Sequence, residues 1–302
     1  MYVKKFSFVF QLVLTIYFCG NAQSQFDNIK SSLSVHNFNE DDYSENDLND
    51  YLHFIINENS YQEAFKNFKN RNYKFGFSLE IDGLNDDILI DYKGNGTSKK
   101  RNKCRLNQFE NKDIKGNYYR KNDRPKFYTA KLLETFAFGL EKNCDDKSPI
   151  IESRVEELVE ILMSPGVAAD LQFIGYKTDL FSSEMLKYYN YKISTSTYDN
   201  KVECVLFEMD LKPAFRERKK KKTIIKSLKS YYNKRTNITV AKEMVVSYKT
   251  PLQNYDINFN VEFDFINGKL LPKRIEYEGV WVVIPHRTEI GRFTIEYSNI
   301  FP

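Results

Sequence analysis

Residues 257–268 read INFNVEFDFING, and this stretch decides the fold. Its apolar residues recur at every second position, which is the period of a strand with one buried face: Ile257, Phe259, Val261, Phe263 and Phe265. Asn267-Gly268 follows, and this dipeptide is typical of a two-residue hairpin turn. Ile275, Tyr277 and Trp281 then mark a returning strand, so the stretch predicts an antiparallel hairpin.

The same alternation recurs along the chain, in residues 73–81, 88–90, 189–193, 202–206, 239–248 and 293–297. A turn is expected at Asp199-Asn200, between two of these strands. Consecutive hairpins form an antiparallel meander. We therefore expect an α+β fold with one large, curved, half-barrel-like antiparallel sheet, built from residues 73–92 and 187–300. Its polar face should meet water through Glu262, Asp264, Arg274, Glu276, Glu278 and Glu296.

Helices are expected mainly in residues 45–70 and 150–163, packed on the apolar face of the sheet. The first of these regions is expected to contain two helices, over residues 45–57 and 61–68. The second carries apolar residues at helical spacing over residues 150–163. Residues 127–141 fit either a helix or a strand. Residues 94–126 are rich in Gly, Asn and Lys, which predicts a long excursion without regular structure. The expected divisions are a signal peptide (1–22), a poorly ordered lead-in (23–44) and a single domain (45–302).

Residues 1–22 have the three parts of a secretory signal peptide. Lys4 and Lys5 precede an apolar run over residues 6–18, and Ala22 ends a segment of small residues. The run is shorter than the roughly 20 residues of a membrane span, which disfavours an anchor. Phe18 disfavours lipidation of Cys19, because cleavage there requires a small preceding residue. We expect cleavage after Ala22, export to the periplasm or the medium, and no transmembrane segment in the mature chain.

The charge balance excludes a dedicated nucleic-acid binder. The whole chain has a formal charge of +4, and removing residues 1–22 takes away two lysines and leaves +2. Two basic clusters remain, in residues 99–105 and 216–222. Their lysines and arginine predict contact with an anionic membrane surface, and solvated loops are the simpler alternative: Lys99, Lys100, Arg101, Lys219, Lys220, Lys221 and Lys222.

Three cysteines follow the signal peptide. In an oxidising compartment three cysteines allow one disulfide and one free thiol. Cys104 and Cys144 lie in polar surroundings, so a disulfide between them is possible. Cys204 lies in an apolar strand, which indicates a small buried side chain.

The search for chemistry finds no catalytic, metal-binding or cofactor-binding motif. The chain has three histidines, His36, His53 and His286, and no two share a spacing that suits one metal ion. His286 would be the best available base for a Ser–His–Asp site assembled from distant residues. We therefore expect a protein that is not an enzyme and has no cofactor.

Two stretches resemble a known family. They are residues 187–213, which contain the turn Tyr198-Asp199-Asn200, and residues 230–248. Together with residues 271–277 they are similar to the β-rich region that follows a carboxypeptidase-regulatory-like repeat in uncharacterised Bacteroidota envelope proteins. The chain lacks that repeat, has Asn200 in place of a turn glycine and adds the lysine-rich residues 216–222. The resemblance implies an envelope location and a sheet like the LolA-like half-barrels.

The sequence features are consistent with three different functions. The leading hypothesis is a non-enzymatic envelope protein that binds an apolar ligand, a lipid or a protein partner on its curved sheet, on a concave aromatic face. The second is a secreted hydrolase with a site assembled from distant residues. The third is a surface or structural component that uses sheet edges for assembly. The sequence does not define the ligand, the partner or the oligomeric state.

Overall fold

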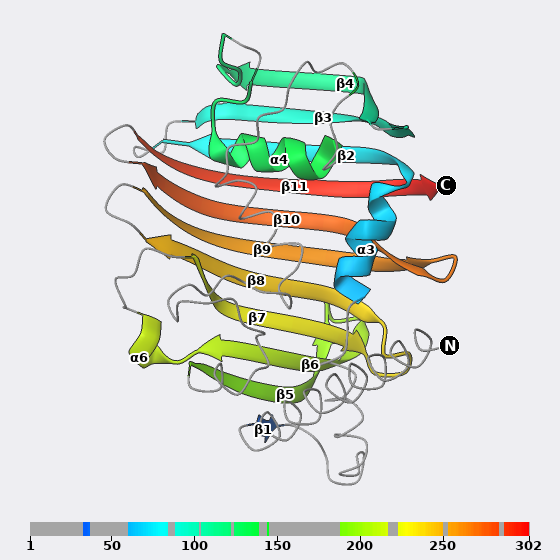
Figure 1. The fold of residues 1–302 in the computed structure, drawn as a ribbon, viewed down its shortest axis with the longest axis vertical. Helices are drawn as coiled ribbons and strands as arrows, with labels where there is room; N and C mark the ends of the chain where they lie inside the picture. Colours follow the sequence, from blue (N-terminus) through cyan, green and yellow to red (C-terminus); the bar gives the residue numbers. More distant parts are fainter. Residues whose placement is uncertain are drawn as a thin grey trace, which may run out of the picture.

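The structure, a computed structural model, describes residues 33–36, 60–83, 88–102, 104–121, 124–138, 144, 188–216, 223–249, 253–283 and 287–301. Within these ranges eleven strands form one open sheet in the order β1-β5-β6-β7-β8-β9-β10-β11-β2-β3-β4 (Figure 1). The predicted signal peptide, the predicted helices at 45–57 and 150–163, and the lysines at 219–222 lie outside these ranges. The segment expected to be a lead-in contains β1 (Leu33–His36).

The predicted antiparallel meander is confirmed. Ten strands pair antiparallel with their neighbours, and β1 pairs parallel with β5. The last strand pairs with the hairpin near the start of the described chain, with Phe293 opposite Leu79. The bounds are β2 (Asn72–Asp82), β3 (Ile88–Arg101), β4 (Cys104–Gly116), β5 (Tyr189–Tyr198), β6 (Val202–Leu211), β7 (Thr223–Asn233), β8 (Thr239–Lys249), β9 (Gln253–Ile266), β10 (Lys269–Val283) and β11 (Arg287–Phe301).

Both predicted turns adopt left-handed backbone conformations. Asn267 and Gly268 have φ of 51° and 74°, and they connect β9 to β10. Asp199 and Asn200 have φ of 47° and 54°, between β5 and β6. Asn and Asp tolerate this conformation better than other residues with side chains, which explains how Asn200 replaces a turn glycine.

The long excursion predicted for residues 94–126 is wrong, because this range contains the second half of β3 and all of β4. The glycines that suggested a loop instead allow close approach between strands. A Cβ on Gly94 would lie 2.9 Å from the ring of Phe77, and one on Gly96 would lie 2.2 Å from the carbonyl oxygen of Gln108. Much of β4 is exposed, so it lacks the apolar alternation of a central strand.

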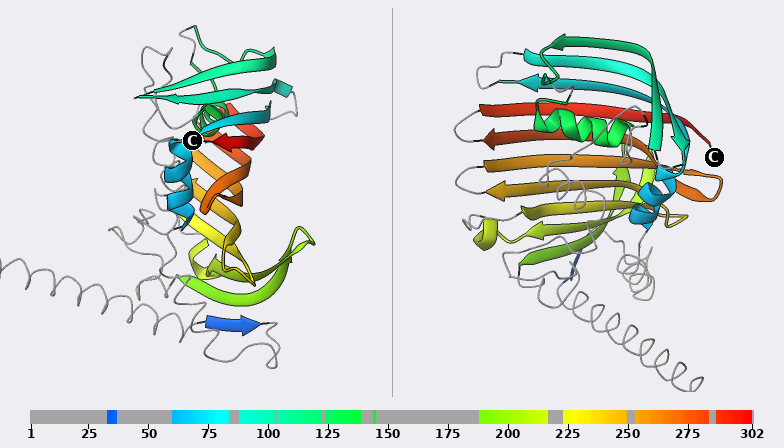
Figure 2. Two further views of the ribbon diagram at one scale, coloured as in Figure 1. Left: turned by 90° about the vertical axis from the view of Figure 1, so that its right-hand side faces the viewer. Right: turned by 45° about the horizontal axis from the view of Figure 1, so that its top comes forward.

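Three helices occur in the described ranges: α3 (Ser60–Lys69), α4 (Tyr128–Phe138) and α6 (Pro213–Arg216). The prediction of a helix at 61–68 is confirmed, and the ambiguous residues 127–141 contain a helix. Helices α3 and α4 lie on the same side of the curved sheet (Figure 2). Phe65 of α3 contacts Phe263 of β9 and Phe136 of α4, so the two helices and the sheet share one aromatic core.

Helix α4 approaches the sheet closely where two glycines face each other. Gly279 of β10 is paired with Gly291 of β11, and a Cβ on Gly291 would lie 2.3 Å from Thr129 Oγ1 of α4. Beside them, the fully buried Trp281 stacks on Tyr128 with ring centroids 4.7 Å apart. Gly291 therefore makes room for the first turn of α4, and Gly279 makes room for the ring of Tyr277, whose Oη would lie 2.2 Å from a Cβ there.

The aromatic face of the sheet, where α3 and α4 lie, is packed as core. A pocket on this face, lined by Phe65, Phe68, Tyr73, Phe136 and Tyr297 among others, has a volume of about 10 Å³. That volume holds no more than about one water molecule. In this part of the sheet the aromatic side chains form the hydrophobic core.

Candidate functional site

The predicted surface lysines lie at one end of β3. Lys99 and Arg101 are exposed, and the backbone N–H of Lys100 donates to Asn72 Oδ1 at 2.8 Å. Arg105, from the same basic cluster, is 1% exposed and belongs to the interior. The second cluster lies outside the described residues, so contact with an anionic surface stays a prediction.

Cys104 and Cys144 are joined by a disulfide, with Cα atoms 5.0 Å apart across a separation of 40 residues. The N–H of Cys144 donates to the carbonyl oxygen of Arg105 at 2.8 Å. Cys204 is free and buried beside Leu206, Tyr231 and Ala241. Burial raises the pKa of its thiol, so Cys204 is a small apolar side chain at neutral pH.

The face opposite α3 and α4 carries polar residues in rows that cross the strands. The register places one row over ten strands, from β5 to β4: Lys192, Glu208, Lys229, Glu243, Asn260, Glu276, Thr294, Ser78, Lys93 and Asp113. Cross-strand neighbours interact directly. In this row Lys192 Nζ lies 3.0 Å from Glu208 Oε2.

Two grooves of about 510 Å³ and 660 Å³ run over this face. They share Ser78, Lys93 and Thr294, and together they extend from β8 to β4. We call the joined grooves the polar trough. Adjacent strands are about 4.8 Å apart, so a trough over seven strands is about 29 Å long.

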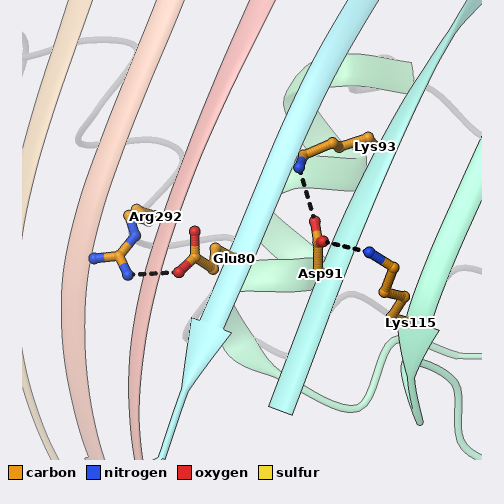
Figure 3. Close-up of polar contacts among 5 residues, drawn as sticks. All are labelled: Glu80, Asp91, Lys93, Lys115 and Arg292. Carbon is orange, nitrogen blue, oxygen red and sulfur yellow. Dashed lines mark hydrogen bonds and ion pairs between the residues drawn. The ribbon is translucent and has the colours of Figure 1, made fainter. Parts of the chain in front are cut away.

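Ion pairs fix the side chains at one part of the trough (Figure 3). Arg292 of β11 donates from Nη2 to Glu80 Oε1 at 2.7 Å and to Asp82 Oδ2 at 2.8 Å. Asp91 of β3 lies 3.4 Å from Lys93 Nζ and 3.3 Å from Lys115 Nζ. All six side chains come from the four neighbouring strands β11, β2, β3 and β4.

These ion pairs lower the pKa of the Glu80 and Asp91 carboxylates. The hydrogen bond from Arg292 is the main cause at Glu80, and partial burial opposes it. At Asp91 burial raises the pKa, but the hydrogen bonds from Lys115 and Lys93 outweigh it. Both groups therefore stay ionised at neutral pH. A general acid requires a raised pKa, so these carboxylates are unsuited to that role.

Arg292→Gln is expected to raise the pKa of Glu80 towards 4.5, because it removes the donor that favours the carboxylate. The wild-type pair stabilises the fold at neutral pH, and this contribution is lost as the pH falls through the lowered pKa of the folded state. Carboxyl-carbon NMR titration measures the shift. Arg274→Gln is the matched control, because Arg274 pairs with Glu276. Identical titration of Glu80 in the wild type and Arg292→Gln would contradict the assignment.

Two further side chains of the trough have no polar partner. Asn258 and Glu278 are exposed and make no hydrogen bond or ion pair in the described part of the chain. Asn260 Nδ2 donates to Glu276 Oε2 at 3.3 Å. The residues that line the trough include seven carboxylates and three cations, and two of the carboxylates, Glu276 and Asp91, also pair with Arg274 and Lys115 at its margin. Its carboxylates are Glu80, Asp91, Asp113, Glu243, Glu276, Glu278 and Glu296.

The alternation of the strands predicts a water-facing position for Glu276, Glu278 and Glu296, but it does not reveal a trough. Each strand reveals which residues share a face, but the rows depend on the register between strands far apart in sequence. Among the described residues, no three Asp, Glu, His or Cys side chains are grouped as metal ligands. No helix in those ranges has the length and apolar character of a membrane span.

No protein-family model matches the chain, and no curated protein matches its sequence. Solved structures of similar shape include a DUF1329 family protein from Desulfovibrio piger, with 10% identity, a TM-score of 0.26, and coverage of 80% of this chain and 89% of that one. A LolA superfamily protein from Nitrosomonas europaea has 12% identity, a TM-score of 0.25, and coverage of 80% and 91%. These scores do not establish a shared fold, so function rests on the residues of this chain.

Proposed function

We propose that the protein is an exported, non-enzymatic binding protein that holds its partner in the polar trough. The single observation that supports this proposal is the contrast between the two faces in the part of the sheet that α3 and α4 cover. One face carries joined grooves of about 510 Å³ and 660 Å³. On the other face, the pocket beneath α3 and α4 has about 10 Å³.

The chemistry of the trough carboxylates supports a binding role. The lowered pKa values of Glu80 and Asp91 keep both groups ionised, so neither is suited to donate a proton as a general acid. The edge strand β4 opposes the alternative of a structural component. Its exposed Lys112 and Lys115, and the bulge opposite Asn95 and Gly96, are features that prevent pairing with a further strand.

Native mass spectrometry of protein purified from the periplasm or the medium tests the proposal. The wild type is expected to carry an adduct, on a chain that begins at Gln23. Asn258→Trp fills the trough from an exposed position and should abolish the adduct. Asn190→Trp introduces the same side chain at an exposed position of β5 outside the trough and should retain it.

Two results would refute the proposal. A wild-type chain without any adduct would argue against a held ligand. An adduct that persists in Asn258→Trp would place the ligand elsewhere, and a lipid mass in that variant would instead support binding at apolar surface.

A further inference from the structure

We infer that three aromatic rings at the β3–β4 edge of the sheet form a binding site for a trimethylammonium group, and that Lys112 occupies this site when no ligand is bound. The rings belong to Tyr92, Phe109 and Tyr119, and we call them the aromatic cage. None of them lines the polar trough, so the inference concerns a second site beyond the proposed function. Its support comes from the position of Lys112, its distances to the rings, and the charge beside them.

A β-bulge brings Phe109 and Lys112 of β4 to the same face of the sheet. In a regular strand, residues three apart point to opposite faces. The register with β3 shifts between Asn95 and Gly96, so that Glu110 is an extra residue of β4 without a partner in that ladder. The bulge therefore places the lysine over the aromatic face, beside the Phe109 ring.

The three rings of the cage lie around the ammonium of Lys112. Its Nζ is 5.1 Å from the centroid of Phe109, 5.3 Å from that of Tyr119 and 5.6 Å from that of Tyr92. The same Nζ donates to Tyr119 Oη at 3.4 Å, and it pairs with no carboxylate among the described residues. Several rings around one cation are the arrangement with which proteins recognise quaternary ammonium groups.

The distances in the cage fit a cation larger than the lysine ammonium. A nitrogen that carries methyl groups lies about 5 Å from a ring, because a C–N bond of about 1.5 Å adds to a carbon–carbon contact of about 3.5–4.0 Å. The three observed distances, from 5.1 to 5.6 Å, lie at or just above that value. The hydrogens of a lysine ammonium are smaller than methyl groups and do not fill this space. The cage therefore has room for a trimethylammonium group at the position of Nζ.

The surroundings of the cage suit a cation with apolar groups. Phe109 is 37% exposed, and its ring centroid lies 5.2 Å from that of Phe138 at the end of α4. Burial and the negative charge of Glu134 raise the pKa of Tyr118. The ring of Tyr118 lies 4.6 Å from that of Tyr119, so the Glu134 carboxylate supplies negative charge beside the cage. The rings would cover the methyl groups, and the ring faces and the carboxylate would attract the positive charge.

Lys112 reduces the affinity of the cage for a ligand. Its ammonium and a ligand cannot occupy the same position, so the apparent affinity falls by the fraction of molecules in which the lysine is displaced. Lys112→Ala removes this competitor and is expected to bind choline about tenfold more tightly than the wild type. Lys115→Ala is the matched control, because Lys115 is exposed on the same strand and pairs with Asp91. It should bind choline as the wild type does.

NMR titration of the mature chain with choline measures these affinities through the backbone amide signals of Gly94 and Phe109. The uncharged probe is 3,3-dimethylbutan-1-ol, in which a tert-butyl group replaces the trimethylammonium group. It should bind Lys112→Ala at least about tenfold more weakly than choline, because a cage of rings attracts the charge. In the Lys112→Ala background, Phe109→Leu should weaken choline binding about fivefold. Phe109→Tyr keeps a ring and should retain the affinity.

Three results would overturn the inference. Lys112→Ala might bind choline no more tightly than Lys115→Ala, or not at all. The alcohol might bind as tightly as choline, which would indicate an apolar contact without recognition of charge. Phe109→Leu might bind choline as tightly as Phe109→Tyr, which would show that the ring is not needed. Asn258→Trp fills the trough and should leave choline binding unchanged, so the two sites are tested separately.

Phosphatidylcholine vesicles distinguish two sources of the trimethylammonium group, a free solute and a lipid headgroup. Co-sedimentation of Lys112→Ala with these vesicles, reversed by choline, would identify a headgroup as the ligand. Choline binding without co-sedimentation would identify a free solute. Each of these results supports the cage as the site.

Discussion

Glu289→Ala is expected to lower the free energy of unfolding by about 3 kcal/mol. Glu289 is 1% exposed and comes from β11, yet it caps helix α4. Its carboxylate accepts from the N–H of Thr129 at 2.8 Å, from the N–H of Tyr128 at 3.2 Å, and from Thr129 Oγ1 at 3.1 Å. The substitution leaves these buried donors without their acceptor at the end of the helix.

Urea unfolding of the mature chain measures this loss. Glu296→Ala is the matched control, because Glu296 is exposed on the same strand and should change stability by about 0.5 kcal/mol or less. The only tryptophan of the chain, Trp281, stacks on Tyr128 at the start of α4, so its fluorescence should shift to the red in Glu289→Ala. A stability equal to that of Glu296→Ala would show that the cap is not needed.

Arg105→Met is expected to cost a similar amount, about 3 kcal/mol. The buried guanidinium donates from Nε to Ser98 Oγ at 2.9 Å and from Nη1 to the carbonyl of Lys69 at 2.8 Å. Nη2 donates to the carbonyl of Arg71, and the group lies 4.7 Å from the centroid of the Tyr73 ring. Arg105 therefore joins the end of α3 to the β3–β4 hairpin.

Methionine has comparable length but no donor, so the carbonyl groups after α3 would lose their partner. Unfolding under non-reducing conditions keeps the disulfide of Cys104 intact and isolates the contribution of Arg105. Arg101→Met changes an exposed arginine of the same sequence cluster and should have little effect. Arg105→Lys should recover only part of the lost stability. A lysine ammonium lacks the planar, forked donors with which the guanidinium reaches all three acceptors. Equal stability of Arg105→Met and Arg101→Met would contradict this role.

The central sheet could be predicted from sequence because each strand carries its own signal. In residues 257–265 the apolar residues alternate without exception, and Asn267-Gly268 fixes the turn that follows. The same local signal is absent in β4. Its exposed side chains lie at the sheet edge, where no apolar face needs to be covered, so the strand was mistaken for a loop.

Long-range contacts explain the other omissions. Arg105 was grouped with Lys99 and Arg101 because the three are neighbours in sequence, and its burial depends on the end of α3. Glu289 caps a helix about 160 residues earlier in the chain, and no local pattern marks that pairing. To predict the polar trough from sequence, one would need the register of all seven strands that form it. Glu278 and Glu80 lie in one row only because β11 joins β10 to β2.

Backbone and indole NMR shifts on addition of the partner test the central claim most directly. The single tryptophan gives one indole N–H signal, and Trp281 is fully buried beside α4 on the aromatic face. Binding in the polar trough predicts shifts centred on Ser78, Asn258 and Glu278, with the Trp281 indole signal unchanged. Shifts centred on the Trp281 indole and on Tyr128, with the trough residues unmoved, would contradict the account.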